Sequence, residues 1–375
     1  MQSTAGQQTF KYSWQNTVSS DVQPPSFCRM LVLGVGGAGN NTVTRLIEMG
    51  IAGAECIAIN TDALHLNVSK AHRKILIGEK LTKGLGVGGD PKLGKAAIEE
   101  SQKRIEELLN GADIVFITAG LGGGTGTGAA PVIARIAKSK GALTVGVVTT
   151  PFRIEKGRIE YAAFALTELR RHCDTVVVID NNKLMQLAPN MPINEAFRIA
   201  DQVLANMIKG IVETISAPSL INLDFADFKT IVKRGGVAVI GIGESDAPNR
   251  AEEAVRNALR NPLLDVDYAG ARGALIHVSG DAQMTIEEAN RVGEIVTEMM
   301  DEDALVIWGA RVSPELDGKL KVTLVMTGVN SPYILSGFET IAPQLFNMEP
   351  YAEPEKPLSI KLDLYQMEQD CADQT

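Results

Sequence analysis

Short apolar runs alternate with helix-length segments along most of this sequence. Largely apolar runs of four to six residues, typical of buried strands in a parallel sheet, occur at Met30–Leu33, Cys56–Ile59, Lys74–Ile77, Ile114–Thr118, Leu143–Val148 and Thr175–Ile179. Helical patterns lie between them, at Asn40–Met49, Lys92–Leu109, Gly128–Lys138 and Ile159–Arg171. This alternation predicts an α/β doubly wound fold with right-handed crossovers.

A long helical pattern from about Ile193 to Ser216 separates this region from a smaller one. Ser219–Asp227 is expected to form a turn. The pattern then predicts strands at 237–242, 274–279, 304–311 and 319–327, with helices at 250–260 and 285–299. Because the last two strands follow one another without a helix, the second sheet is expected to be mixed. The predicted architecture is a Rossmann-like parallel-sheet domain, a long central helix and a smaller mixed-sheet α/β domain.

Composition narrows the classes of function. The net charge of −9 over 375 residues argues against nucleic acid or an anionic membrane as the main partner. The four cysteines are far apart and the histidines lack ligand spacing, which excludes a disulfide framework and predicts no dedicated metal site. No apolar run reaches the length of a bilayer span, and the N-terminus has no basic-then-apolar signal. We therefore expect a soluble cytoplasmic protein without direct membrane insertion.

The first glycine motif, Gly34–Gly39, follows a predicted strand and opens a helix. Glycines let the backbone approach a phosphate, and the helix N-terminus offers free N–H groups. The motif also fits the G-x-G-x-x-G dinucleotide fingerprint, so a nicotinamide-dependent oxidoreductase is one alternative. The acid expected about 20 residues later is absent, because the second strand ends in Asn60-Thr61-Asp62.

The second motif, Gly122–Gly128, carries five glycines and two threonines between a strand and a helix. Glycine loses the most conformational entropy on folding, so five glycines would be costly in an ordinary connection. A run of backbone N–H groups with two hydroxyls instead suits a binding site for a diphosphate or triphosphate. It is not a Walker A motif, because no G-K-[ST] ends it. A third loop, Gly84–Gly89, precedes the Asp90-Pro91 helix start. Three such loops at strand-to-helix ends of one sheet predict a polyphosphate ligand.

Four motifs, G-G-A-G-N-N at 36–41, A-I-N-T-D-A at 58–63, K-G-L-G-V-G-G-D-P at 83–91 and G-G-G-T-G-T-G-A-A-P at 122–131, resemble the tubulin/FtsZ family of GTPases over residues 28–330. The resemblance implies a tubulin/FtsZ-like fold with a GTP-binding domain at 28–217 and a C-terminal GTPase-activating domain at 218–330. It implies GTP or GDP with Mg²⁺ as ligands. The implied loop contacts are Gly36, Gly37, Ala38, Gly39, Asn40, Asn41, Asp62, Gly86, Gly88, Gly122, Gly123, Gly124, Thr125, Gly126, Thr127 and Gly128.

The resemblance also implies contacts to the base and the ribose. Asn181 matches a guanine-contacting asparagine, Phe197 a ring that stacks on the base, and Asp201 a carboxylate that accepts from guanine N1–H and the 2-amino group. Phe197 and Asp201 are four residues apart and share one helix face. The alternative places Phe197 in the core and Asp201 on a solvated face. Further implied contacts are Pro151, the ribose-binding Glu155, and Arg158, which is alternatively a solvated first-turn charge.

The segment Asn222–Asp227 matches the N-x-D-x-x-D loop of the family, with Ser219 where a glycine is usual. The resemblance implies that Asn222, Asp224 and Asp227 complete the active site of the next subunit in a head-to-tail homopolymer, where the aspartates orient the attacking water. The alternative is an ordinary capped helix start. The implied function is an assembly-dependent GTPase of the cell-division ring at mid-cell; the alternative is a cytoskeletal filament for cell shape.

The two ends of the chain lose the strand–helix pattern. Residues 1–27 are rich in Gln, Ser and Thr and are expected to be a disordered arm. Residues 331–375 hold eight acids and two lysines. Within them, Leu358, Ile360, Leu362 and Leu364 alternate as in a strand that adds to the sheet edge of a partner. This predicts a peptide that recruits a membrane-anchoring division protein, with plain disorder as the alternative.

Overall fold

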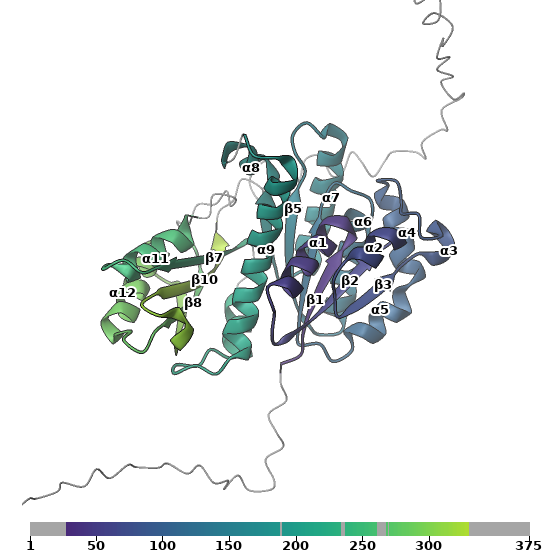
Figure 1. The fold of residues 1–375 in the computed structure, drawn as a ribbon. Helices are drawn as coiled ribbons and strands as arrows, with labels where there is room; N and C mark the ends of the chain where they lie inside the picture. The colour runs from purple at the N-terminus through teal and green to yellow at the C-terminus, as the bar shows by residue number, and fades with distance from the viewer. Residues whose placement is uncertain (1–27, 188–189, 234–236, 261–267, 269, 330–375) are drawn as a thin grey trace, which may run out of the picture. The chain divides into compact units, whose positions relative to one another are not determined.

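The computed structural model describes residues 28–187, 190–233, 237–260, 268 and 270–329 (Figure 1). The predicted N-terminal arm, the acidic tail and the tail peptide lie outside these described residues. The proposed domain boundary at residue 217 stays a prediction.

Ten strands form one sheet in the order β3-β2-β1-β4-β5-β6-β7-β10-β8-β9. Neighbouring strands from β3 to β6 pair in parallel, and β10 runs antiparallel to both β7 and β8, so the strand directions of the second half are mixed as expected. These strands do not form the expected second sheet, because they continue the first one. The halves are joined where Val176 of β6 pairs with Val237 of β7. The strands are β1 (Met30–Val35), β2 (Ala54–Asn60), β3 (Arg73–Leu76), β4 (Ile114–Gly120), β5 (Leu143–Thr150), β6 (Thr175–Asp180), β7 (Val237–Ser245), β8 (Gly273–Gly280), β9 (Leu305–Val312) and β10 (Leu320–Val329).

The helices of the described residues include all those predicted, with changes at their ends. They are α1 (Gly36–Glu48), α2 (Ala63–Val68), α3 (Glu79–Thr82), α4 (Pro91–Glu100), α5 (Gln102–Leu109), α6 (Thr125–Ser139), α7 (Lys156–His172), α8 (Asn181–Leu187), α9 (Ile193–Ser216), α10 (Phe225–Val232), α11 (Arg250–Leu259) and α12 (Ile286–Thr297). A 3₁₀ turn, η1, spans Pro314–Leu316.

Two helix predictions were wrong in detail. The segment predicted as one helix at Lys92–Leu109 is divided at Ser101, whose ψ of 11° leaves the helical range. There the Ser101 hydroxyl accepts a hydrogen bond from the backbone N–H of Gly78 at 3.2 Å. The predicted turn at Ser219–Asp227 ends in the first three residues of α10, because Asp224 caps a helix that begins at Phe225.

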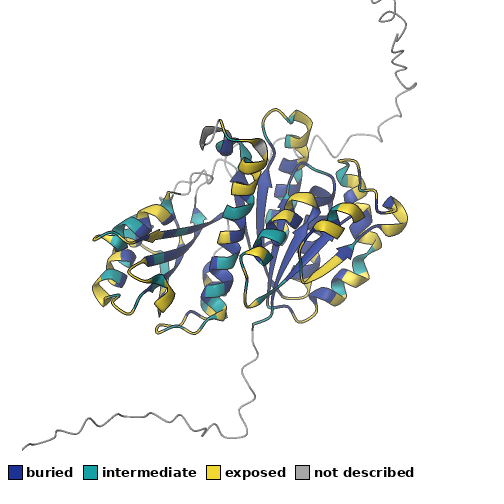
Figure 2. Cartoon of the chain, in the orientation of Figure 1, coloured by how far each residue is buried: buried dark blue, intermediate teal, exposed yellow. Residues whose placement is uncertain are grey.

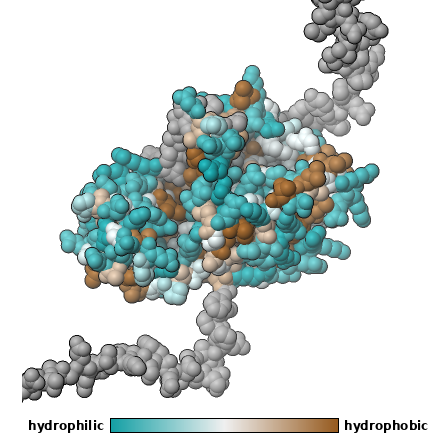
Figure 3. Space-filling view, in the orientation of Figure 1, coloured by the Kyte–Doolittle hydropathy of each residue, from teal (hydrophilic) through white to brown (hydrophobic). Residues whose placement is uncertain are grey.

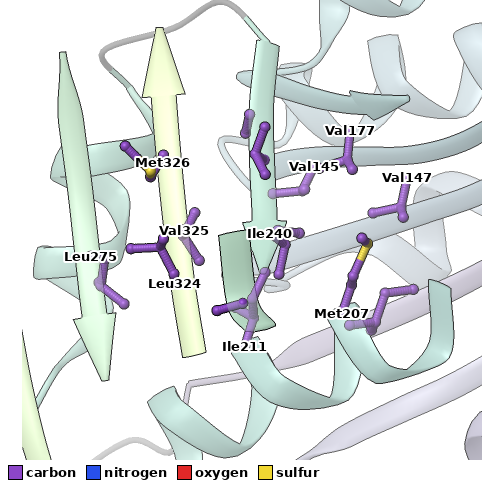
Figure 4. Packing of buried hydrophobic residues seen from close by; sticks show 14 of the residues in the cluster. Val145, Val147, Val177, Met207, Ile211, Ile240, Leu275, Leu324, Val325 and Met326 are labelled. Carbon is purple, nitrogen blue, oxygen red and sulfur yellow. The ribbon is translucent and has the colours of Figure 1, made fainter. Parts of the chain in front are cut away.

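Strand residues alternate between two apolar cores on opposite faces of the sheet. In β1, Leu31 and Leu33 belong to the core beneath α4 to α7, whereas Met30 and Val32 belong to the core shared with α1 and α9. The central strands are buried along most of their length, as Figure 2 shows, whereas the edge strands β3 and β9 are largely exposed or half-buried. The second core continues from the parallel half into the mixed half, where Val147, Met207, Ile240 and Leu324 belong to one cluster (Figure 4). This continuous core fixes α9 against both halves of the sheet.

Candidate nucleotide-binding site

The three glycine segments meet at the ends of β1 and β4. A Cβ on Gly36 would lie 2.9 Å from the backbone nitrogen of Gly126, and a Cβ on Gly124 would lie 2.9 Å from that of Asp90. Such distances are below any that real Cβ atoms adopt, so glycine is what permits this approach. Gly36 also has a φ of +73°, a conformation that favours glycine. The loops predicted to share one ligand therefore do lie together.

The third glycine loop, Gly84–Gly89, does not directly follow a strand, although the sequence predicted that it would. It follows the short helix α3 and not directly the strand β3. Two backbone hydrogen bonds hold it to the end of β2: Ala63 N–H donates to Gly84 O at 2.9 Å, and Gly86 N–H donates to Thr61 O at 3.1 Å. This pairing brings Gly86 and Gly88 to the side of the sheet where the other two loops lie.

Two helices begin inside the glycine motifs without side-chain caps. The structure starts α1 at Gly36 and α6 at Thr125, where the sequence predicted starts at Asn40 and Gly128, and neither has a side-chain hydrogen bond at its N-cap. The neighbouring α2 and α4 differ, because the carboxylates of Asp62 and Asp90 accept from their first-turn N–H groups. The uncapped N–H groups and positive dipole ends of α1 and α6 suit an anion.

The threonines of the second motif fix the loop itself. Thr127 Oγ1 accepts a hydrogen bond from Gly122 N–H at 2.8 Å, and the hydroxyls of Thr125 and Thr61 lie 2.7 Å apart. Both threonines of the motif are buried. Their hydroxyls therefore shape the cradle, and the N–H groups of Gly122 and Gly128 at its two ends are already paired within the loop.

The glycines differ in what surrounds them. A Cβ on Gly123 would meet nothing within 4 Å, and one on Gly37 would meet only His65 Nε2, at 3.8 Å. These two positions border open space, as do the exposed Ala38, Asn41 and Gly88. By contrast, Gly39, Gly126 and Gly128 have backbone of neighbouring elements where a side chain would be. The first group has open space beside it, and the second group allows close packing.

The predicted base contacts gather at the first turns of α8 and α9. The rings of Phe197 and Phe152 meet edge to face with centroids 5.7 Å apart, and Phe197 remains 41% exposed. This exposure excludes the core alternative for Phe197. Among the described residues, Oδ1 of Asn181 is buried without a hydrogen-bond partner, as are both amide atoms of Asn40. Buried polar atoms without partners are costly, and a bound ligand or water would relieve that cost.

Asp201 lies on α9 and faces α1. Its Oδ1 is 3.5 Å from Thr42 Oγ1. Burial raises the pKa of Asp201 to about 7, and the opposing effects of Arg45 and the Thr42 hydroxyl are smaller. Asp201 is half-buried against α1, so a fully solvated face does not describe this residue. A buried carboxyl of this kind has much to gain from ligand N–H donors.

The segment after β5 places Pro151 and Arg158 beside Gly122, and Glu155 pairs with Arg158. A Cβ on Gly122 would lie 3.0 Å from Cβ of Arg158 and 3.1 Å from Cγ of Pro151. Glu155 accepts a hydrogen bond from Phe152 N–H at 3.0 Å, and its other oxygen pairs with Arg158 at 2.5 Å. Arg158 is mostly exposed. The ion pair therefore arranges this edge of the site.

Sequence reasoning missed residues that support this edge. Asn182 donates to Asp180 Oδ1 at 2.7 Å, and Asn182 Oδ1 accepts from Arg153 N–H at 2.8 Å. Asp180 is buried at the end of β6. Through these hydrogen bonds, Asn182 connects the segment next to Phe152 to the end of β6, where Asn181 lies. The polar run Asp180-Asn181-Asn182 after an apolar strand was the available signal.

The predicted catalytic aspartates lie at the far end of α9. Phe197 and Asp201 are in its first turns, whereas Asn222, Asp224 and Asp227 follow its last turn (Figure 1). From Asp201 to Ser216 the helix rises about 22 Å at 1.5 Å per residue. The helix α10 that begins after Asp224 packs on β8, β9 and β10. Within one chain, these aspartates are remote from the glycine loops.

Asp224 and Asp227 form a reciprocal capping box at the start of α10. Asp227 N–H donates to Asp224 Oδ1 at 2.9 Å, and Asp224 N–H donates to Asp227 Oδ2 at 3.0 Å. The capped helix start that the sequence offered as an alternative is thus present. Asn222 and Asp224 are exposed and Asp227 is half-buried. The box occupies one oxygen of each carboxylate.

Comparison with known proteins assigns the chain to a family. Residues 29–189 match the Tubulin/FtsZ family, GTPase domain, and residues 236–330 match the FtsZ family, C-terminal domain. The cell division protein FtsZ 2 of Methanocaldococcus jannaschii is 56% identical over 310 residues, which cover 82% of each chain. The chain belongs to the FtsZ family. The cell division protein FtsZ 1 of Thermococcus kodakarensis is 52% identical over 337 residues, 90% of this chain and 88% of that protein.

Solved structures agree with the family assignment. An empty FtsZ dimer of M. jannaschii superposes with a TM-score of 0.76 at 54% identity, covering 81% of this chain and 89% of that chain. GDP-bound CetZ1 of Haloferax volcanii, at 24% identity, has a TM-score of 0.73 over 85% of this chain and all of that chain, and shares the fold. The tubulin/FtsZ fold expected from the motifs is confirmed. The matched family model is a GTPase domain, so the alternative of a nicotinamide-dependent oxidoreductase is not supported.

Proposed function

We propose that this FtsZ-family chain binds and hydrolyses GTP and polymerises head to tail, with hydrolysis completed between adjacent subunits. The observation that carries this proposal is the position of the two half-sites at opposite ends of α9. A single chain cannot bring Asp224 to the nucleotide held by its own glycine loops. In a head-to-tail stack, the Asp224 loop of one subunit closes over the nucleotide of the next.

In this arrangement the phosphates lie over the N-termini of α1 and α6, and the guanine lies at Phe197, Asn181 and Asp201. A carboxylate at Asp201 accepts from N1–H and the 2-amino group of guanine, a donor pair that adenine lacks. Glu155 is assigned to the ribose. The buried carboxyl of Asp201 and the unpaired Oδ1 of Asn181 support this orientation.

Mg²⁺ is proposed to arrive with the nucleotide. Among the described residues there is no group of three or more His, Cys, Asp or Glu side chains that could hold a metal ion. Mg²⁺ commonly keeps several waters and binds through substrate phosphates, so a glycine cradle of this kind is compatible with it. When bound, the ion neutralises charge on the phosphates. Removing it by chelation is expected to stop turnover.

Hydrolysis requires mainly positioning, because phosphoryl transfer involves little covalent chemistry for the protein. Asp224 and Asp227 are proposed to orient the water that attacks the γ-phosphate, with Asn222 beside them. Their capping box holds both carboxylates at the first turn of α10. The aspartates can thus be presented to a neighbouring subunit in a fixed geometry.

Exposed apolar side chains beside the glycine loops and in the loop that carries Asp224 support the head-to-tail contact. Leu64, Val68 and Leu85 are each at least 75% exposed beside the glycine loops, and Figure 3 shows this apolar area over α2. Leu220, 74% exposed, lies in the loop that carries Asp224. Exposed apolar patches mark interaction sites. An apolar patch on one surface and an exposed leucine on a different one fit a heterologous contact, which does not close and so produces filaments.

The test is GTP hydrolysis per subunit, measured against protein concentration with Mg²⁺ present. We expect a threshold in the native protein and loss of turnover at all concentrations in Asp224→Ala, with nucleotide affinity unchanged. Glu287→Ala is the matched control, because Glu287 is also an exposed acid at the first turn of a helix. A native rate that stays flat from dilute to concentrated protein, or full turnover in Asp224→Ala, would contradict the proposal.

The cellular role follows from the relatives. The M. jannaschii and T. kodakarensis proteins are named as cell division proteins, which favours a division ring over a shape-determining filament. We place the filament in the cytoplasm at mid-cell. No described helix has the length and apolar character to cross a bilayer. A membrane-anchoring partner that binds residues 357–367 is proposed; equal recovery of partners with a chain truncated after Gln344 would remove it.

A further inference from the structure

The loop between α9 and α10 is docked on the mixed half of the sheet. Ile221 N–H donates to Ala310 O at 3.1 Å, and Ala310 N–H donates to Ile221 O at 3.2 Å. Leu223 is 1% exposed and lies where Gly309 has no side chain: a Cβ on Gly309 would be 2.6 Å from Leu223 Cγ. The middle of the loop is thus fastened to β9.

A buried histidine meets the beginning of the same loop. His277 on β8 is 4% exposed, and its register places it opposite Gly309 of β9, so both face the loop. Its Nε2 lies 3.4 Å from Ser219 Oγ, and its Nδ1 lies 3.4 Å from Ser279 Oγ. Ser219 Oγ also donates to Ala217 O at 3.3 Å. The histidine therefore links the sheet to the point where the chain leaves α9.

One arrangement of protons satisfies these contacts. Burial lowers the pKa of His277 to about 4, helped by Arg311 on β9 and Lys321 on β10, so the ring is neutral near pH 7. A neutral ring has one donor and one acceptor. If Nε2–H donates to Ser219, the Ser219 hydroxyl can donate to Ala217 O and Nδ1 can accept from Ser279. Every polar atom of the group then has a partner.

We propose that His277 is a positioning residue for GTP hydrolysis, acting through Ser219 to hold the loop that presents Asp224 to the neighbouring subunit. This inference rests on the proposed function, since it concerns the same loop. His277 touches no substrate; it fixes the loop at its start, as Gly309 fixes it at its middle. Small displacements of a catalytic group can cost large factors in rate.

The primary test is Ser219→Ala, which removes one hydroxyl and leaves the backbone contacts of the loop. Loss of a neutral hydrogen bond that holds the reacting geometry is expected to lower turnover per assembled subunit about fivefold. Nucleotide affinity should not change, because Ser219 lies at the other end of α9 from the base contacts. Thr230→Ala is the control: it removes an exposed hydroxyl of α10 that bonds within its own helix, to Ala226 O.

A double-mutant cycle separates positioning from general stability. His277→Gln keeps a side-chain N–H donor and should retain more turnover than His277→Leu. In the His277→Leu background, Ser219→Ala should cause no further loss, because the shared contact is already gone. Turnover is measured per subunit in sedimented polymer, with the melting temperature and nucleotide affinity recorded for each variant. If the leucine variant does not fold, His277→Ala serves as the background of the same cycle, because it also removes both ring nitrogens.

Two results would overturn the positioning role: unchanged turnover in Ser219→Ala, or an undiminished Ser219→Ala loss when His277 is replaced. Asp224→Ala belongs in the same series. If Asp224→Ala abolishes turnover while Ser219→Ala does not change it, the proposed function stands and the inference about His277 fails. If Asp224→Ala retains turnover, the proposed function itself fails.

Discussion

Guanine nucleotide affinity should depend on pH through Asp201. Burial raises the pKa of this carboxyl to about 7 in the empty site, so it is largely protonated at pH 6 and largely ionised at pH 8. Guanine offers two N–H donors, and only the ionised carboxylate accepts both. Affinity should therefore rise with pH through 7 and level off near 8. With a bound-state pKa below 6, binding at pH 6 is expected to be about tenfold weaker than at pH 8.

The same group sets the sign of a stability change in the nucleotide-free protein. Because the folded-state pKa lies above the ordinary value of 3.8, the native protein binds more protons than the unfolded chain between about pH 4 and pH 7. Stability from this group is therefore lost as pH rises through that window. At 1.36 kcal/mol per pKa unit, the upper limit is about 4 kcal/mol. Asp201→Asn should reduce the pH dependence of the melting temperature.

Calorimetric titration with GDP in two buffers of different ionisation enthalpy measures both affinity and proton release. We expect release of nearly one proton per GDP attributable to Asp201 at pH 6 and little at pH 8. The phosphates of GDP also titrate. The contribution of Asp201 is therefore the difference in proton release between the native protein and Asp201→Asn. An identical pH slope and proton count in the two proteins would refute the reasoning, since Asp201 would then not change its ionisation on binding.

Two further predictions concern the cradle and the base. Gly124→Ala must displace Asp90 or Val87, so it should cost about 1–3 kcal/mol of stability and weaken nucleotide binding. The control Gly123→Ala places its methyl group in open space and should leave the melting temperature unchanged. Equal melting temperatures for the two variants would contradict this prediction. Phe197→Ala should weaken GDP binding by about 1–3 kcal/mol without loss of stability, because the ring is partly exposed, and unchanged affinity in a titration would remove its stacking role.

The sequence predicted the strands and the convergence of the glycine loops well, because both depend on local patterns. Buried parallel strands are continuous apolar runs, and each glycine loop follows such a run or lies before a capped helix. The starts of α1 and α6 were placed three or four residues late. Glycine is among the poorest helix formers. A helix start predicted from residue propensities therefore falls after the glycines with which these two helices begin.

What the sequence did not predict depends on contacts between distant segments. The division at Ser101 follows from a bond to Gly78, 23 residues away. The join between β6 and β7 follows from one pairing that no periodicity encodes. The buried state of Asp201 depends on α1 packing against α9. The four-residue spacing predicted that Phe197 and Asp201 share one helix face. The raised pKa of Asp201 could not be predicted from the sequence, because it depends on the helices packed around this residue.

The two interpretations of Asp224 and Asp227 are compatible, and one substitution separates them. The capping box uses Oδ1 of Asp224 and Oδ2 of Asp227, so it fixes the direction of the remaining oxygen of each carboxylate. Asp224→Ala removes cap and charge together, and loss of the cap alone costs about 1 kcal/mol. Asp224→Asn keeps an acceptor that caps as well as aspartate does. It should retain the melting temperature and assembly yet lose turnover, because the amide no longer offers a charge to the attacking water. If Asp224→Asn retains native turnover per assembled subunit, the carboxylate serves only to begin α10.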